Sequence, residues 1–186
     1  MLDEKALRWL GLTLLGLGSL GFGCANIDGG GGTGGGGTGG GAMTGPAVPS
    51  AILPAAPKLH HVGVIQPDME AAADFMALFN HEEEYRGFVE AFSCWCIFLK
   101  APPGQAAVEL VVPEGGPLAK FNRGAGGLHH YAFETADLVA LQAELAARDV
   151  RMLEETPVKG AGNFLCNFVH PVSTRGIIIE YVQPLG

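Results

Sequence analysis

The sequence has few positive charges. From Met43 to the end of the chain, nine lysines and arginines stand against sixteen aspartates and glutamates, a net charge of −7. Such a surface repels nucleic-acid phosphates and anionic lipid head groups. We therefore expect no nucleic acid and no membrane surface among its partners, and we expect a substrate that is a small molecule or is bound to a carrier or a peptide.

The sequence is also poor in cysteine. Its four cysteines are Cys24, Cys94, Cys96 and Cys166, and none forms a C-x-x-C pair or a zinc-knuckle spacing. Cys94 and Cys96 would share one face of a strand, where they are badly placed to bond to each other. This pattern favours buried free thiols in a reducing compartment, and hence a cytoplasmic protein.

The apolar run at residues 9–23 is 15 residues long. A spanning helix needs roughly 18 to 20, so we do not predict one. Residues 29–42 follow with the blocks GGGGTGGGGTGGG, which form a flexible linker. We interpret residues 1–28 as a peptide partner or substrate tethered by an engineered linker. The alternative is a bacterial lipoprotein signal that is processed at Cys24.

The folded part is expected to begin after an uncharged lead-in at residues 43–57, which carries four prolines. Residues 58–186 then contain an internal repeat, with modules at about 58–113 and 127–184. The motif HHVGV at residues 60–64 returns as HHYAF at residues 129–133, an offset of 69.

Both modules follow one plan. A strand leads to an aspartate at a helix N-cap, Asp68 or Asp137, and to a helix with one apolar face. Three strand-like runs follow each helix; they lie at residues 84–88, 94–100 and 107–112, and again at 150–154, 163–169 and 176–182. The pattern predicts an α+β domain made of two βαβββ modules.

A lone carboxylate, Glu109 or Glu180, lies in the apolar last strand of each module. An unpaired buried carboxylate is costly, so each requires a cation or a hydrogen-bond network. Pseudo-twofold packing would bring these glutamates to one histidine from each His-His pair. Because adjacent strand residues face opposite ways, periodicity does not say which histidine. Two imidazoles and two carboxylates suit one divalent ion of Mn, Fe, Co, Ni or Zn.

Four segments carry a resemblance to the vicinal-oxygen-chelate, or glyoxalase-like, superfamily, and within it to the methylmalonyl-CoA epimerase group. They read HVGVIQPDMEAAADF, VELVVPEGGPLAKF, GLHHYAFETADL and NFVHPVSTRGIIIEYV. The resemblance implies a curved mixed sheet that forms a half-barrel cup. It also implies the metal ligands His61, Glu109, His130 and Glu180. Extradiol dioxygenases of the superfamily use only two histidines and one glutamate, so a fourth candidate favours the isomerases and lyases.

The chemistry implied by the resemblance is electrophilic. The metal chelates two neighbouring substrate oxygens and stabilises an enolate or oxyanion, so that a carboxylate base, Glu180 or Glu109, can remove an α-proton. Several epimerases of the group place a catalytic glutamate where this chain has Cys96. Cys96 is therefore a third catalytic candidate, and methylmalonyl-CoA itself becomes doubtful as the substrate.

Two further hypotheses stay open from the sequence. One is a biosynthetic-cluster enzyme or accessory protein that acts on, or binds, a peptide represented by residues 1–28. The other is a non-catalytic small-molecule-binding protein of the antibiotic-resistance kind. Cys166, Asn167 and His170 are weaker candidates for lining the cup, and the residues do not decide between a monomer and a homodimer.

Overall fold

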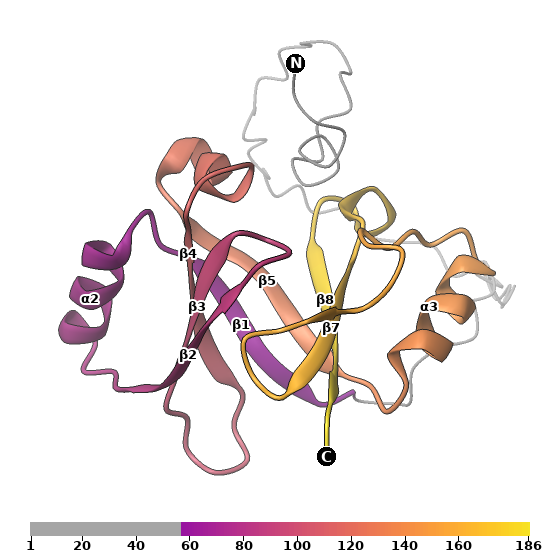
Figure 1. Ribbon diagram of the computed structural model, residues 1–186, viewed down its shortest axis with the longest axis horizontal. Coiled ribbons are helices and arrows are strands. Elements are labelled where there is room, and N and C mark those ends of the chain that lie inside the picture. Colours follow the sequence, from indigo (N-terminus) through magenta and orange to yellow (C-terminus); the bar gives the residue numbers. More distant parts are fainter. Residues whose placement is uncertain (1–56) are drawn as a thin grey trace, which may run out of the picture.

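The computed structural model describes residues 57–186 (Figure 1). The peptide at 1–28, the linker at 29–42 and all but the last residue of the lead-in at 43–57 lie outside the described residues, so those expectations remain predictions. Residues 57–186 contain no helix that combines the length and the apolar character needed to span a membrane.

Each module has one α-helix and four strands, as predicted. The first module comprises β1 (Leu59–Ile65), α2 (Met69–Leu78), β2 (Glu83–Val89), β3 (Cys94–Leu99) and β4 (Ala107–Pro113). The second comprises β5 (Gly127–Glu134), α3 (Leu138–Ala146), β6 (Val158–Lys159), β7 (Phe164–Val169) and β8 (Ile178–Pro184). Two 3-10 helices that the sequence did not predict, η1 (Leu118–Gly124) and η2 (Pro171–Thr174), precede β5 and β8.

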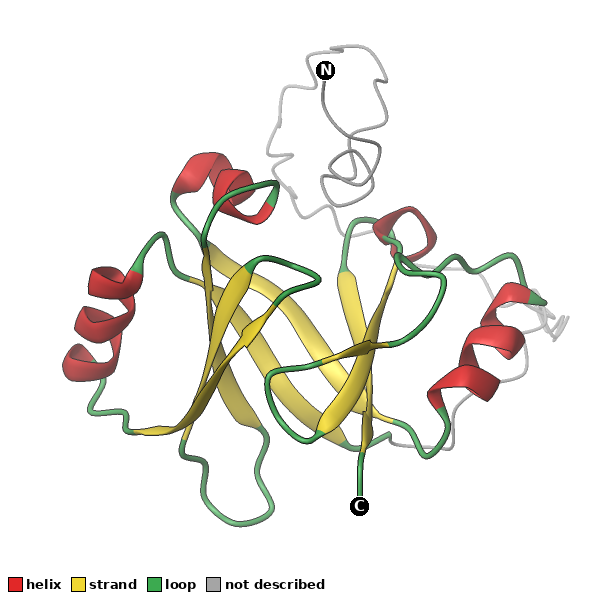
Figure 2. Cartoon of the chain, viewed as in Figure 1, coloured by secondary structure: helices red, strands yellow, loops and turns green. Residues whose placement is uncertain are grey.

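The strands form one eight-stranded mixed sheet in the order β2-β3-β4-β1-β5-β8-β7-β6. Strands β1 and β5 pair antiparallel at its centre, and each pairs in parallel with the last strand of its own module. The sheet curves into a nearly closed cup, and α2 and α3 flank it on opposite outer sides (Figures 1 and 2). The predicted α+β architecture is confirmed.

The helices begin where the aspartates predict. The Asp68 carboxylate accepts a hydrogen bond from the backbone N–H of Ala71 at 2.8 Å, and Asp137 accepts one from Ala140 at 2.9 Å. These bonds satisfy N–H groups that have no partner within the helix. The apolar helix faces pack on the outer side of the sheet, where Leu138 of α3, for example, is fully buried.

The inner side of the cup is a second apolar layer shared by both modules. Phe98 of β3 lies in the same buried cluster as Phe164 and Phe168 of β7, although more than 60 residues separate them in the sequence. Because this cluster joins the two halves, the modules share the inner part of their core.

The prediction of a strand at residues 150–154 is wrong. Met152 forms only an isolated bridge with Val169, and regular pairing resumes in β6. The side chain of Asn167 takes the place of a strand partner: its Oδ1 accepts from the Glu154 N–H at 3.1 Å, and its Nδ2 donates to the Glu154 carbonyl at 2.8 Å. Both backbone groups of that residue are thus satisfied outside the ladder, and the chain leaves the sheet edge.

Candidate metal centre

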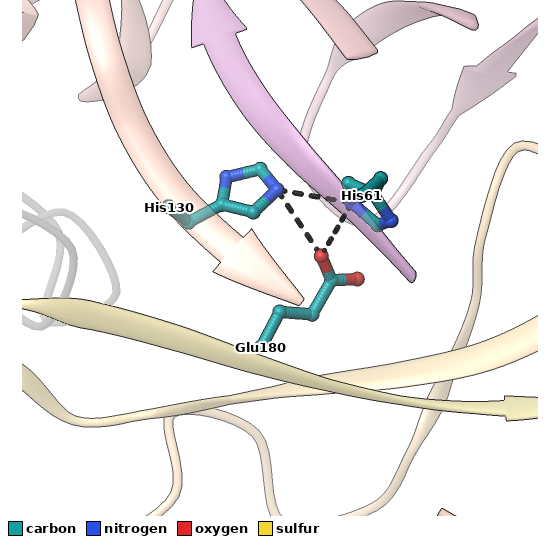
Figure 3. Close-up of side chains that lie close together, drawn as sticks. All are labelled: His61, His130 and Glu180. Carbon is teal, nitrogen blue, oxygen red and sulfur yellow. Dashed lines mark hydrogen bonds and ion pairs between the residues drawn. The ribbon is translucent and has the colours of Figure 1, made fainter. Parts of the chain in front are cut away.

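The four predicted ligand side chains meet at the centre of the cup. They come from its four central strands: His61 from β1, Glu109 from β4, His130 from β5 and Glu180 from β8. None exposes more than 5 % of its surface. Figure 3 shows three of them, His61, His130 and Glu180, pointing toward one another.

The polar atoms of this group lie close together. The Nε2 atoms of His61 and His130 are 3.2 Å apart, and one Glu180 oxygen lies 2.9 Å from the first and 3.1 Å from the second. These three residues offer ligand atoms that all lie within 4.8 Å of one another. A Glu109 oxygen faces the same nitrogens from slightly farther away, at 3.5 and 3.3 Å.

The strand register explains why these side chains converge. Gly63 lies opposite His130 on one side and Glu109 on the other, and Ala132 lies opposite His61 and Glu180. A Cβ on Gly63 would lie 2.0 Å from Cε1 of His130, so the ring occupies the space above this glycine. Each module therefore places a small residue two positions after its histidine, which makes room for the histidine of the other module.

The two strands also carry a β-bulge each, at matching places. Leu59 and His61 pair with the consecutive residues Phe133 and Ala132, so His60 is the extra residue in β1. In β5 the extra residue is His129. A bulge turns a side chain away from the regular alternation. Both rings of each His-His pair therefore meet on one side, contrary to the strict alternation used in the sequence analysis.

Each pair is joined through its Nδ1 atoms. These atoms are 2.7 Å apart in His60 and His61, and 2.9 Å apart in His129 and His130. Burial lowers the pKa of His60, and it lowers the pKa of His129 to about 3, so both rings are neutral near pH 7.

The charges of the cluster require compensation. Burial alone would lower the pKa of His61, but the Glu180 and Glu109 carboxylates outweigh burial and raise it to about 10. The same attraction outweighs the effect of burial on Glu180 and lowers its pKa to about 2. The two buried carboxylates thus favour positive charge on the nearby imidazoles. One divalent cation can supply the charge that two imidazolium protons would otherwise supply.

The donor set fits a divalent ion. Imidazole nitrogens and carboxylate oxygens bind Zn²⁺ at about 2.0–2.2 Å, so neighbouring ligand atoms lie about 3.4 Å apart around a tetrahedral ion and about 3.0 Å apart around an octahedral one. The contacts among His61, His130 and Glu180 are 2.9 to 3.2 Å. The spacing of His61, His130 and Glu180 is therefore consistent with a divalent metal site.

A small cavity of about 30 Å³ adjoins the cluster. Its wall is mainly apolar, it includes Phe92, Phe164 and Phe168, and it contains no lysine or arginine. A volume of this size accommodates one or two water molecules. The cavity next to the ligands is thus apolar and, in this conformation, smaller than an organic substrate.

Three free cysteines, Cys94, Cys96 and Cys166, line the same cavity. Cys94 and Cys96 share one face of β3, as predicted, with Sγ atoms 3.9 Å apart. The contact with Cys94, burial and the nearby Glu109 carboxylate all raise the pKa of Cys96, and burial near Glu180 raises that of Cys166. Cys96 and Cys166 therefore stay protonated near pH 7.

The other weak candidates do not reach the cavity wall. Asn167 bonds to Glu154 and to Gln142 of α3, and His170 accepts a hydrogen bond from the Val172 N–H at the start of η2. Gly63 and Ala132 were not among the predicted site residues. A signal for them was present, because His-x-small occurs in both copies of the repeat, as His-Val-Gly and His-Tyr-Ala.

Comparison with known proteins identifies the family to which this chain belongs. Residues 60–168 match the family model described as the Glyoxalase/Bleomycin resistance protein/Dioxygenase superfamily. The chain is 30 % identical over 141 residues to the ethylmalonyl-CoA/methylmalonyl-CoA epimerase of Cereibacter sphaeroides. This match covers 68 % of the chain and 97 % of the relative.

Solved structures show the same fold. The crystal structure of methylmalonyl-CoA epimerase from Mycobacterium tuberculosis matches with a TM-score of 0.64 at 26 % identity, over 69 % of this chain and 89 % of that one. A methylmalonyl-CoA epimerase in complex with methylmalonyl-CoA and NH4+ matches with a TM-score of 0.61 over 70 % of this chain and 96 % of its own. At 24 % identity, this second match shows a shared fold.

We expect Gly63→Ala to disturb the cluster without unfolding the domain. The added methyl group would force the His130 ring out of place, and the affinity for Zn²⁺ should fall about 10- to 100-fold, as when the orienting contact of a ligand is lost. Competition with a fluorescent chelator measures this change. Val62→Ala, on the opposite face of β1, is the matched control, and equal affinities for the two variants would contradict the prediction.

Binding of a divalent ion should release protons. Below the His61 pKa of about 10 the cluster holds imidazolium protons that the ion must displace, so affinity should fall as the pH is lowered from 8 to 6, by up to about tenfold per pH unit for each proton displaced. Calorimetry in two buffers with different ionisation heats counts these protons. His81→Ala, at an exposed site, should leave the count unchanged. An affinity independent of pH over this range would refute the expectation.

Proposed function

Because this chain belongs to the glyoxalase/bleomycin resistance protein/dioxygenase superfamily, we propose that it is a divalent-metal-dependent isomerase or epimerase that removes a proton next to a substrate carbonyl. A related lyase reaction would use the same first step. The observation that carries the proposal is the convergence of His61, His130 and Glu180, with Glu109 beside them, in the buried centre of the cup.

His61, His130 and Glu180 would hold the ion, with Glu109 as the fourth ligand candidate. Mn, Fe, Co, Ni and Zn all accept this mixture of nitrogen and oxygen donors. When bound, a divalent ion supplies electrophilic stabilisation of the negative charge that develops on two neighbouring substrate oxygens.

We assign proton removal to Glu109 before Glu180. Glu180 lies 2.9 and 3.1 Å from the two imidazole nitrogens, whereas Glu109 lies 3.5 and 3.3 Å from them, so Glu109 is the less tightly held carboxylate. Its ionised form is favoured, because the two histidines lower its pKa despite its burial. It therefore meets the first requirement of a general base at neutral pH.

Cys96 would serve as a proton donor. It lines the cavity together with Glu109, and its raised pKa keeps it as a thiol. A thiol in this state can give a proton to carbon or oxygen, and the thiolate that this leaves would take up the proton that Glu109 removed, since the two side chains are hydrogen-bonded. Proton donation by Cys96 differs from the role of the catalytic glutamate that several epimerases carry at the same position, because a glutamate there can also act as a base.

The substrate class that fits best is a carbonyl compound with a second oxygen nearby, and acyl-CoA thioesters are the first class to test. The Cereibacter sphaeroides relative is named for two such thioesters, ethylmalonyl-CoA and methylmalonyl-CoA. The apolar wall of the cavity suits the carbon skeleton of the acyl group. Since the cavity is only about 30 Å³, its lining residues Gly160 and Ala161, the second of which lies against Gly87 of β2, would have to move when a substrate enters.

A non-catalytic binding protein is the second candidate. The family description includes bleomycin resistance proteins, and a cup lined by Phe92, Phe164 and Phe168 could bind a ligand without turnover. An enzyme or accessory protein that acts on a peptide represented by residues 1–28 remains a hypothesis from the sequence, because that segment lies outside the described residues.

The proposal is tested by exchange of the α-proton of methylmalonyl-CoA or ethylmalonyl-CoA with deuterated solvent, followed by mass spectrometry. The metal-loaded protein should catalyse exchange, and a chelator or His130→Ala should abolish it. Glu109→Gln keeps an amide oxygen that can bind the ion but lacks the base, so exchange should fall about 10²- to 10⁴-fold while the metal remains bound.

Glu90→Gln, at an exposed site in the turn after β2, is the matched control and should exchange at the rate of the unchanged protein. Exchange that survives His130→Ala would exclude the metal-dependent mechanism. Tight binding of either thioester with no exchange in any metal form would support the binding protein instead.

A further inference from the structure

The first histidine of each His-His pair has no place in the proposed metal site, yet both pairs are built alike. The Nδ1 atoms of His60 and His61 are 2.7 Å apart, and those of His129 and His130 are 2.9 Å apart. At such distances one nitrogen donates a hydrogen bond and the other accepts it. The same contact therefore occurs in both modules.

The backbone is shaped to make this contact. Neighbouring side chains on a regular strand point to opposite faces, so two adjacent rings would not meet. In each strand the extra residue of the β-bulge is the first histidine of the pair, His60 in β1 and His129 in β5. A bulge interrupts the regular strand pairing, and both bulges here bring the two rings of a His-His pair to the same side of the strand.

Aromatic neighbours hold the two outer rings. His60 meets Phe164 edge to face, with ring centroids 5.2 Å apart, and His129 meets Phe121 of η1 in the same way at 5.0 Å. These contacts fix the ring planes. Each outer histidine therefore presents its Nδ1 atom in a defined direction.

The direction of the hydrogen bond follows from the ligand role of the inner histidines. A neutral imidazole that binds an ion through Nε2 carries its proton on Nδ1. The partner nitrogen must then accept, which requires His60 and His129 to be neutral with their proton on Nε2. We propose that His60 and His129 are positioning residues that accept the Nδ1–H of His61 and His130 and so fix the tautomer and orientation of two metal ligands. This inference rests on the proposed metal site.

An imidazole acceptor differs in charge from the more familiar carboxylate acceptor. The cluster already contains the carboxylates of Glu109 and Glu180, which balance one divalent ion. Two more carboxylates behind the histidines would give the buried site a net negative charge, which is costly. Neutral imidazoles orient the ligands and leave the charge balanced.

The test compares His129→Asn with His129→Phe. Asparagine keeps an acceptor close to the position of Nδ1, whereas phenylalanine keeps the ring shape but has no acceptor. Zn²⁺ affinity, measured by chelator competition, should fall about 10- to 100-fold in His129→Phe and recover most of that loss in His129→Asn. His60→Phe and His60→Asn should repeat the pattern at His61.

A spectroscopic measurement on the unchanged protein removes the dependence on variant folding. Long-range ¹H–¹⁵N correlations of the Zn²⁺-loaded protein should show the proton on Nε2 of His60 and His129 and on Nδ1 of His61 and His130. A proton on Nδ1 of His129, or equal Zn²⁺ affinities for His129→Phe and the unchanged protein, would overturn the inference. Failure of the unchanged protein to bind any divalent ion, or binding that survives His130→Ala, would instead overturn the proposed function.

Discussion

Two carboxylates buried next to two imidazoles form the constraint on which this structure depends. Glu109 and Glu180 lie on β4 and β8, the strands that flank the central pair of the sheet, and they are almost fully enclosed. Charges in such a place require compensation of opposite sign. The cup therefore has to bring His61 and His130 to the same point, and the register of the four central strands does so.

The duplication of the module brings the histidines and glutamates of both halves to one point. Antiparallel pairing of β1 with β5 places each histidine opposite the small residue of the other module, and parallel pairing with β4 and β8 adds a glutamate on the far side. Neither half contains a complete ligand set. A site assembled at the seam of two modules is stable only when both modules are folded, so the chemistry and the shared core depend on the same contacts.

The surroundings of the cluster suit chemistry next to a carbonyl. The wall formed by Phe92, Phe164 and Phe168 lowers the local polarity and strengthens each electrostatic interaction within the cup. Cys96 and Cys166, at equivalent places in the two modules, add thiols where the sheet faces the cavity. The presence of thiols beside carboxylates distinguishes this site from one in which carboxylates alone carry protons. It fits the proposal that Cys96 donates a proton.

The sequence by itself determined the repeat, the two helix starts at Asp68 and Asp137, and the recurrence of a His-His pair and a lone glutamate in each module, whereas the choice of His61 and His130 within the pairs came from the family resemblance. These features are local or recur at a fixed offset, so pattern and spacing reveal them. Only the tertiary structure decided the bulges at His60 and His129, which turn both rings of each pair to one side. It also decided that residues 150–154 form no strand, because the side chain of Asn167 binds the backbone of Glu154 there. The physical reason is that a bulge or a missing strand depends on what lies across the sheet, and periodicity along one strand carries no information about its partner.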